Sequence, residues 1–93
     1  MDIRFYVDPE TGEPHIHGHN VSQAEVVEVL LHPGEDRPGS EDARVTIGRT
    51  SNGRYLRVIY VLDEEAGSIF VITAYELRGK PLTAYQRRRR KKQ

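Results

Sequence analysis

Hydrophobic and polar residues alternate over residues 3–7, where Ile3, Phe5 and Val7 are the apolar positions. This period of two predicts a half-buried strand near the start of the chain. The Pro and Gly within residues 8–12 then indicate a turn. The following stretch carries histidines at every second position, and the pattern is compatible with either a short extended segment or a loop.

The first helical pattern begins with a capping box, in which Ser22 precedes Glu25 by three residues. We predict a helix over residues 22–32, ended by Pro33 because proline cannot continue a helix. Its apolar face is expected to carry Ala24, Val26, Val27, Leu30 and Leu31. Residues 33–42 hold two Pro, two Gly and four acidic residues, and this composition predicts a mobile loop.

The second half of the chain alternates with a period of two. It predicts strands over residues 43–50, 55–62 and 69–75, and the last is apolar on both faces at its start. The Asn-Gly pair at positions 52 and 53 is typical of a hairpin turn between the first two. A break at Gly79-Lys80-Pro81 precedes a helical pattern over residues 82–90.

This order of elements predicts an α+β fold. Strands joined by short hairpins favour an antiparallel sheet of about four strands, of which the last three form a meander, with both helices on one face. We interpret residues 1–93 as a single domain, because the chain is too short for two hydrophobic cores. The basic tail over residues 87–93 is expected to be mobile, since a run of like charges repels itself.

Charge is distributed unevenly although its sum is zero. Residues 1–42 carry a net charge of −8 and residues 43–93 a net charge of +8. Such asymmetry indicates a basic surface for a polyanion, or a basic tail. Half of the twelve positive residues lie in the run from Arg87 to Lys92. This run is expected either to bind nucleic acid or an acidic partner, or to be a solvated end.

Several function classes are excluded by what the sequence lacks. There is no cysteine, so disulfides, thiolate catalysis and Cys-ligated metals are ruled out. Neither an apolar run of about 20 residues nor a leader pattern is present, which favours a cytoplasmic protein without a membrane span. The Gly-rich phosphate loops, the nucleophile-elbow motif and the His-Glu-x-x-His zinc motif are also missing.

Three groups of side chains remain as candidates for chemistry. His15, His17 and His19 would face one side of an extended segment, as metal ligands, as RNA-contacting or catalytic groups, or as an ordinary polar loop. We expect no bound metal or other cofactor, because all three lie within five residues, whereas catalytic zinc ligands usually include a longer spacer.

The second group is the strand arginines. Arg49 and Arg54 flank the predicted hairpin and are expected to lie side by side, with Arg57 on the strand face beyond them. Guanidinium groups bind phosphate bidentately and stay charged, which suits a phosphate site. Alternatively, these arginines keep the sheet edge soluble.

The third group is Tyr75, Glu76 and Arg78 at the end of the last strand, where a Tyr can stack on a base and a Glu can accept a proton. A strand end with a satisfied ion pair is the alternative interpretation.

Several short motifs resemble those of the BrnT-type toxins. Residues 5–9 (Phe-Tyr-Val-Asp-Pro) resemble the F-x-W-D-P opening of that family, and residues 19–22 (His-Asn-Val-Ser) resemble its H-G-V-S segment. Residues 46–50 (Thr-Ile-Gly-Arg-Thr) and the Gly-Arg-x-Leu-x-Val pattern from Gly53 match its I-G-R-T and G-R-x-L-x-V strands most closely. The chain resembles this family, or an uncharacterised sister family of the same fold.

BrnT-type proteins are similar to the RelE superfamily of ribonuclease toxins, which implies a RelE-like fold and metal-independent cleavage of mRNA. The resemblance implies a partner antitoxin of the ribbon-helix-helix type, and a homodimer is possible. The catalytic residues expected on this basis are His19, Arg49, Arg54 and Tyr75. The RNA-binding residues expected are Arg57, Arg78, Lys80, Arg87 and Arg88. The alternative is a catalytically inactive module of the same fold that binds nucleic acid or an acidic protein.

Overall fold

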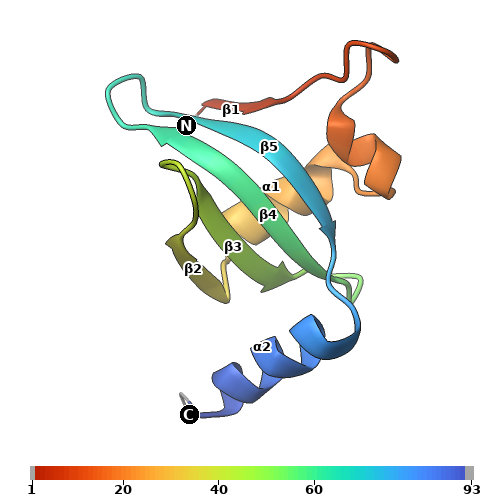
Figure 1. Cartoon of the computed structure of the whole chain (residues 1–93), viewed down its shortest axis with the longest axis vertical. Coiled ribbons are helices and arrows are strands. Elements are labelled where there is room, and N and C mark those ends of the chain that lie inside the picture. Colours follow the sequence, from red (N-terminus) through yellow and green to blue (C-terminus); the bar gives the residue numbers. More distant parts are fainter. Residues whose placement is uncertain (1, 92–93) are drawn as a thin grey trace.

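The computed structural model describes residues 2–91 and shows an α+β fold built on one five-stranded sheet (Figure 1). The strands lie in the order β1-β5-β4-β3-β2. Along the chain the elements are β1 (Asp2–Phe5), the 3₁₀ helix η1 (His15–His19), α1 (Gln23–Leu31), β2 (Glu35–Pro38), β3 (Arg44–Arg49), β4 (Tyr55–Asp63), β5 (Ser68–Glu76) and α2 (Gly79–Lys91). The predicted α+β class and the meander of the last three long strands are confirmed.

The sheet is mixed rather than antiparallel. β1 pairs with β5 in parallel, with Ile3 opposite Ile69 and Phe5 opposite Val71, whereas the other neighbours are antiparallel. Alternation along β1 indicates only that one face of this strand is buried. The strand's direction depends on the path that the chain takes through η1 and α1, which no local pattern specifies.

The segment predicted as a loop over residues 33–42 contains a fifth strand. β2 pairs antiparallel with β3, placing Glu35 opposite Ile47 and Pro38 opposite Arg44. Side chains reinforce this pairing: the Thr46 hydroxyl donates to the Glu35 carbonyl at 2.8 Å. Charged residues and a Pro are typical of an edge strand, so β2 forms without the apolar alternation on which sequence prediction depends.

α1 covers one face of the sheet, which we call the helix face (Figure 1). The predicted capping box is present, because the Ser22 hydroxyl accepts from the Glu25 N–H while the Glu25 carboxylate accepts from the Ser22 N–H. Val26 and Val29 are completely buried against the core. The predicted apolar stripe is wrong in detail, since Leu31 is 66% exposed.

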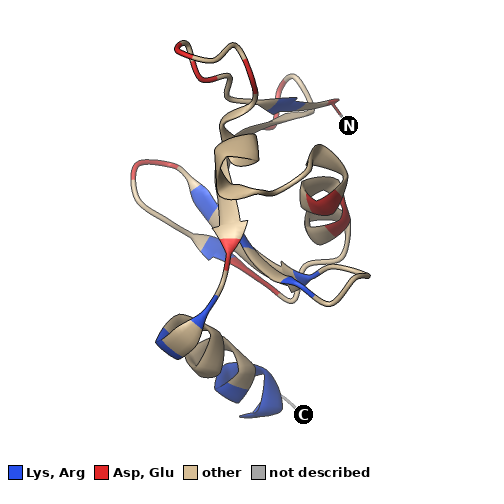
Figure 2. Ribbon diagram, turned by 90° about the vertical axis from the view of Figure 1, so that its right-hand side faces the viewer, with Lys and Arg blue, Asp and Glu red and all other residues tan. Residues whose placement is uncertain are grey.

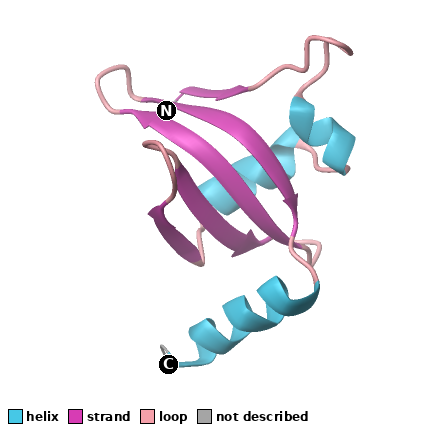
Figure 3. Ribbon diagram, in the orientation of Figure 1, coloured by secondary structure: helices cyan, strands magenta, loops and turns pink. Residues whose placement is uncertain are grey.

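α2 packs on the opposite face, which we call the open face, so the prediction that both helices share one face is wrong. Figures 1 and 3 show α2 below the sheet and apart from α1. Tyr85 is buried on α2 and forms a second small core with Ile47 and Leu77, flanked by Tyr55 and Leu82. Because paired residues of neighbouring strands share a face, the alternation of β3 and β4 places this second core opposite α1.

α2 begins at Gly79, three residues earlier than predicted, and includes the segment expected to break the chain. Pro81 is accommodated because it lies in the first turn, where a backbone N–H has no helical partner. The helix extends through Lys91, so residues 87–91 of the basic tail are helical, while 92–93 lie outside the described residues. No helix within residues 2–91 combines the length and apolar character required to cross a bilayer.

Candidate nucleic-acid interface

The three histidines form a 3₁₀ helix instead of an extended segment. Ile16 is 1% exposed, and its burial in the main core holds η1 beside β5. The helix ends at Asn20, whose φ of 60° reverses the chain. As a result, the three side chains do not line one side of an extended segment, because His15 and His19 contact one another while His17 lies beside Glu13. The geometry predicted for them is wrong.

His15 and His17 have different acidic neighbours. Nδ1 of His17 lies 3.0 Å from the Glu13 carboxylate, and Nδ1 of His15 lies 3.9 Å from the Asp8 carboxylate. The rings of His15 and His19 are in edge contact, with centroids 5.1 Å apart. Within residues 2–91, no three His, Asp or Glu side chains are grouped closely enough to hold a metal ion.

His19 and Tyr75 are brought together from different parts of the chain. Their ring centroids are 6.0 Å apart, in an edge contact between η1 and the end of β5. Tyr75 is opposite Arg57 in the sheet register, and its hydroxyl accepts a hydrogen bond of 3.2 Å from Nη1 of Arg57. The guanidinium carbon of Arg57 lies 5.9 Å from the centre of the Tyr75 ring. Three of the predicted site residues therefore form one cluster.

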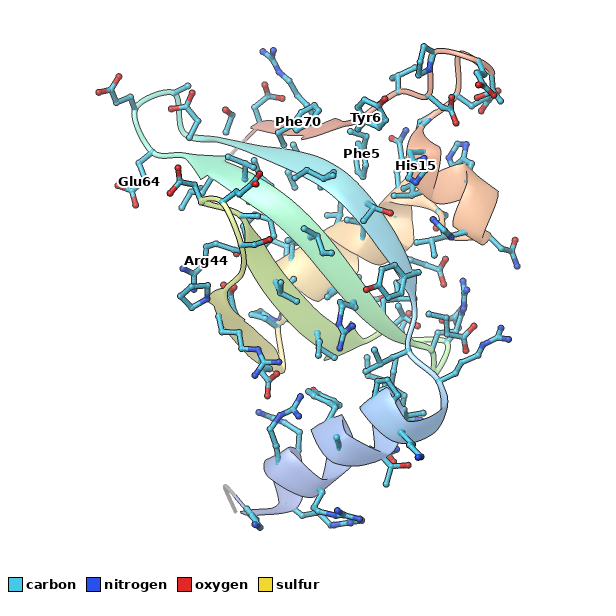
Figure 4. The ribbon with its side chains drawn as sticks, viewed as in Figure 1. Phe5, Tyr6, His15, Arg44, Glu64 and Phe70 are labelled. Carbon is cyan, nitrogen blue, oxygen red and sulfur yellow. The ribbon has the colours of Figure 1, made fainter. Side chains whose placement is uncertain are left out.

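This cluster continues in both directions as a row of aromatic and cationic side chains. At one end the His15 ring lies 6.0 Å from the Tyr6 ring, and Figure 4 shows these two side chains next to one another. At the other end Tyr55 shares the open face with Arg57, and the Arg49 guanidinium lies 5.5 Å from the Tyr55 ring centre. We call this set the cation–aromatic row; its members are Tyr6, His15, His19, Tyr75, Arg57, Tyr55 and Arg49.

Arg57 has an unusual environment within the row. Its Nε is buried and has no hydrogen-bond partner among the described residues, although Nη1 is bonded to Tyr75. A buried donor without an acceptor costs free energy, since the water it has lost is not replaced. No carboxylate of the described residues forms an ion pair with this guanidinium. Arg57 can therefore accept an anionic ligand without first giving up an acidic neighbour.

Arg54 has the opposite environment. Its Nη1 bonds both Glu25 carboxylate oxygens at 2.9 Å and the Asn20 carbonyl at 3.0 Å, and its Nη2 lies 3.3 Å from Glu76. These contacts join the end of η1, α1, the turn before β4 and β5 at the edge of the helix face. The prediction that Arg49 and Arg54 lie side by side is not what the structure shows, because Arg54 is ion-paired toward α1 and Arg49 packs on Tyr55.

The carboxylates around Arg54 are held in their charged form. Burial acts to raise the pKa of Glu25, but hydrogen bonds from the Ser22 N–H and from Arg54 outweigh it and lower that pKa. Arg78 and Arg54 together lower the pKa of Glu76. Burial acts to lower the pKa of Arg54, but its bonds to Glu25 and Glu76 prevail and raise it. The group is a structural ion-pair cluster, as in the alternative interpretation for Glu76 and Arg78.

The remaining predicted RNA-binding residues lie on or near α2. Arg78 pairs with Glu76 at 3.1 Å and is otherwise exposed, while Lys80 and Arg87 are exposed. Arg88 forms two bonds with the Glu35 carboxylate, at 2.8 and 3.0 Å. Figure 2 shows that the end of α2 is the most continuous basic segment of the fold. Of these residues, Lys80 and Arg87 are the ones most available to an external anion.

Sequence reasoning did not single out two aromatic members of the row, Tyr6 and Tyr55. Tyr6 is at a polar position of an alternating strand, and Tyr55 is the first residue of a predicted strand, on the face that carries Arg57. Both positions were compatible with an ordinary surface residue. A search for aromatic residues two positions before a strand arginine would have found Tyr55, since residues i and i+2 share a face.

Comparison with known proteins identifies a family. Residues 16–76 match the family described as a domain of unknown function, DUF4258, and the chain belongs to that family. The matched segment extends from η1 to the end of β5 and includes His19, Arg57 and Tyr75. No curated protein matches the chain. No solved structure matches it either.

Proposed function

We propose that this member of the DUF4258 family is a metal-independent endoribonuclease that binds single-stranded RNA along the cation–aromatic row. The observation that carries the proposal is the contact of His19, Tyr75 and Arg57, whose guanidinium forms no ion pair with a carboxylate of residues 2–91. The rings of the row are exposed or half-buried, and the guanidinium groups of Arg57 and Arg49 lie beside those of Tyr75 and Tyr55. This combination suits single-stranded RNA, because bases stack on aromatic rings while cations contact phosphates.

The proposed reaction is an internal transfer. The ribose 2′-oxygen attacks the adjacent phosphorus, and the bond from phosphorus to the 5′-oxygen of the next nucleotide breaks. His19 takes or gives one proton, and His15, whose ring contacts it, performs the other transfer. Arg57 stabilises the charge that develops on the phosphate oxygens, and Tyr75 holds a base. The products are a 2′,3′-cyclic phosphate and a 5′-hydroxyl end.

The experiment is an RNA cleavage assay in the presence of EDTA. We expect the wild-type protein to cut a labelled single-stranded RNA and to leave the all-deoxy analogue intact, because the attacking 2′-oxygen is then absent. His19→Gln should reduce the cleavage rate by roughly 10²–10⁴-fold. His17→Gln is the matched control, since His17 bonds Glu13 and has no ring contact with the row. Cleavage that requires a metal ion, or that His19→Gln leaves unchanged, contradicts the proposal.

The resemblance to BrnT-type and RelE-like toxins extends the proposal to the toxin component of a type II toxin–antitoxin pair, acting on mRNA in the cytoplasm. Phe70 and Ile72 are 41% and 37% exposed on the open face, which provides an apolar surface for a ribbon-helix-helix antitoxin. Figure 4 shows Phe70 on β5, on the same side of the molecule as Tyr6. A neighbouring gene for such a small protein supports this extension, and its absence opposes it.

The environment of Arg54 favours a second candidate, a catalytically inactive module that binds nucleic acid. Two carboxylates occupy Arg54, so the row has fewer guanidinium groups near the histidines than predicted. This candidate predicts RNA binding that weakens steeply with salt and produces no cut strands. The cleavage assay distinguishes the two functions, because both bind RNA and only the first yields cyclic-phosphate ends.

A further inference from the structure

A hollow of about 530 Å³ lies between α2 and the beginning of β4, next to the Arg49 end of the cation–aromatic row. We call it the α2 pocket. Its walls come from four separate segments: the α1–β2 connection, the end of β3, the start of β4 and α2. The lining residues are His32, Pro33, Gly34, Arg49, Tyr55, Tyr85, Gln86, Arg89 and Arg90.

The walls of the α2 pocket are cationic. Three of the nine lining residues are arginines and none is acidic. Arg49 and Arg90 are exposed and form no ion pair with any residue of the described range 2–91. Arg88 is adjacent in sequence but differs, because it is neutralised by the Glu35 carboxylate outside the pocket. Uncompensated guanidinium groups around one hollow produce a positive potential that attracts anions.

The pocket is held in its shape before any ligand binds. Nη1 of Arg89 donates to the Gly34 carbonyl at 2.6 Å, which ties the last turn of α2 to the α1–β2 connection. The Tyr85 hydroxyl occupies the space beside Gly34, and a Cβ on Gly34 would clash with that oxygen. Tyr55 contacts Tyr85 in an edge arrangement at 6.0 Å and carries Arg49 on its own ring. Fixed walls reduce the entropy that a ligand must overcome on binding.

The chemistry of the walls selects a phosphate ester with a planar group. Guanidinium groups bind phosphate oxygens in a bidentate manner and remain charged at all physiological pH values. Tyr55 and His32 add planar side chains on which a nucleobase can stack. The volume lies within the range of roughly 300–1,000 Å³ that is typical of small-molecule sites.

We propose that the α2 pocket binds the phosphate monoester of a nucleotide, with Arg49 and Arg90 on the phosphate oxygens and Arg89 holding the wall. A free mononucleotide and the 5′-phosphate end of an RNA strand share this chemistry. If the ligand is an RNA end, the inference rests on the proposed nuclease function. If the ligand is a free mononucleotide, it does not, since the pocket is distinct from the contact between His19 and Tyr75.

The experiment measures binding to the full chain by titration calorimetry and by amide chemical shifts. The probes are adenosine 5′-monophosphate, adenosine, inorganic phosphate, and a short RNA with either a 5′-phosphate or a 5′-hydroxyl. We expect the monophosphate to bind and to shift the amides of Gly34 and Tyr55, and adenosine to bind at least tenfold more weakly. Arg90→Gln, alone and combined with Arg49→Gln, should weaken the monophosphate at least tenfold. Arg4→Gln is the control, because Arg4 is exposed on β1 and pairs with Asp2.

The outcomes distinguish a free nucleotide from an RNA end as the ligand, and they test the pocket proposal independently of the nuclease proposal. Tighter binding of 5′-phosphorylated RNA than of the mononucleotide identifies a strand end, and equal affinity identifies a free nucleotide. Absence of monophosphate binding, or binding that Arg90→Gln and the double variant leave unchanged, overturns the pocket proposal. His19→Gln should reduce the cleavage rate as stated above and retain monophosphate binding. Wild-type protein that binds the monophosphate but cuts no RNA supports the pocket and contradicts the nuclease.

Discussion

Arg54 and Arg57 are three residues apart, yet they belong to regions with opposite electrostatic character. Arg54 lies at the edge of the helix face, where its guanidinium donates hydrogen bonds to Glu25, to Glu76 and to a backbone carbonyl. Arg57 lies on the open face, where Tyr75 is its only hydrogen-bond partner among the described residues. An arginine is therefore available to a ligand only where the fold does not place a carboxylate beside it.

The opposite net charges of the two halves of the chain are partly neutralised by ion pairs between those halves. Acidic residues of the first half pair with basic residues of the second: Glu25 with Arg54, Glu35 with Arg88, and Asp36 with Arg44. These pairs tie α1 and β2 to the sheet and to α2. Arg49, Arg57 and Arg90 form no ion pair with another residue of the described range 2–91. They are located on the open face and on α2, where a polyanion can reach them.

Replacing Arg57 should change the rate of catalysis more than any other property considered below. Arg57→Gln should lower the rate of RNA cleavage by roughly 10²–10³-fold, because it removes the charge that stabilises the phosphate transition state. The free energy of unfolding should change by less than about 0.5 kcal/mol, since no carboxylate of residues 2–91 is ion-paired with Arg57. Cleavage rates and denaturant unfolding of the same preparation provide both values. A large loss of stability with unchanged cleavage would reverse the roles assigned to the two arginines.

The next effect concerns stability. Arg54→Gln should lower the free energy of unfolding by about 2 kcal/mol, because the partly buried Glu25 carboxylate loses its charged partner. Arg78→Gln is the matched control: its side chain is 80% exposed and it shares Glu76, so about 0.5 kcal/mol or less is expected. Urea unfolding measures both variants. Equal stability of the two variants would show that the Arg54 cluster does not hold the helix face together.

The smallest effect is the pH dependence of the same cluster. The pKa values of Glu25 and Glu76 are lowered in the folded chain from their ordinary value of 4.5. The two carboxylates therefore contribute fully to the free energy of unfolding above pH 4.5. This contribution is lost as the pH falls through their pKa values in the folded chain. The stability difference between wild type and Arg54→Gln should shrink between pH 6 and about pH 3. Unfolding curves across this range check it, and a difference that grows in acid would contradict the assigned charges.

Local signals predicted those parts of the molecule whose causes are local. The Ser22–Glu25 capping box is a contact across three residues, and it started the helix where predicted. The alternation of β3, β4 and β5 and the turns between them likewise depend on neighbours in the chain. Candidate residues such as His19, Arg57 and Tyr75 were recognisable by their chemistry, because side-chain type is read directly from the sequence.

Which of those side chains contact one another depends on how distant segments of the chain pack together. The direction of β1, the pairing of the charged strand β2 and the placement of α2 opposite α1 all depend on contacts between distant segments. The separation of Arg54 from Arg57 has the same origin, because Glu25 reaches Arg54 across 29 residues. Amino-acid types and periods are local properties of a chain, whereas charge compensation and the positions of pockets arise when remote segments pack together.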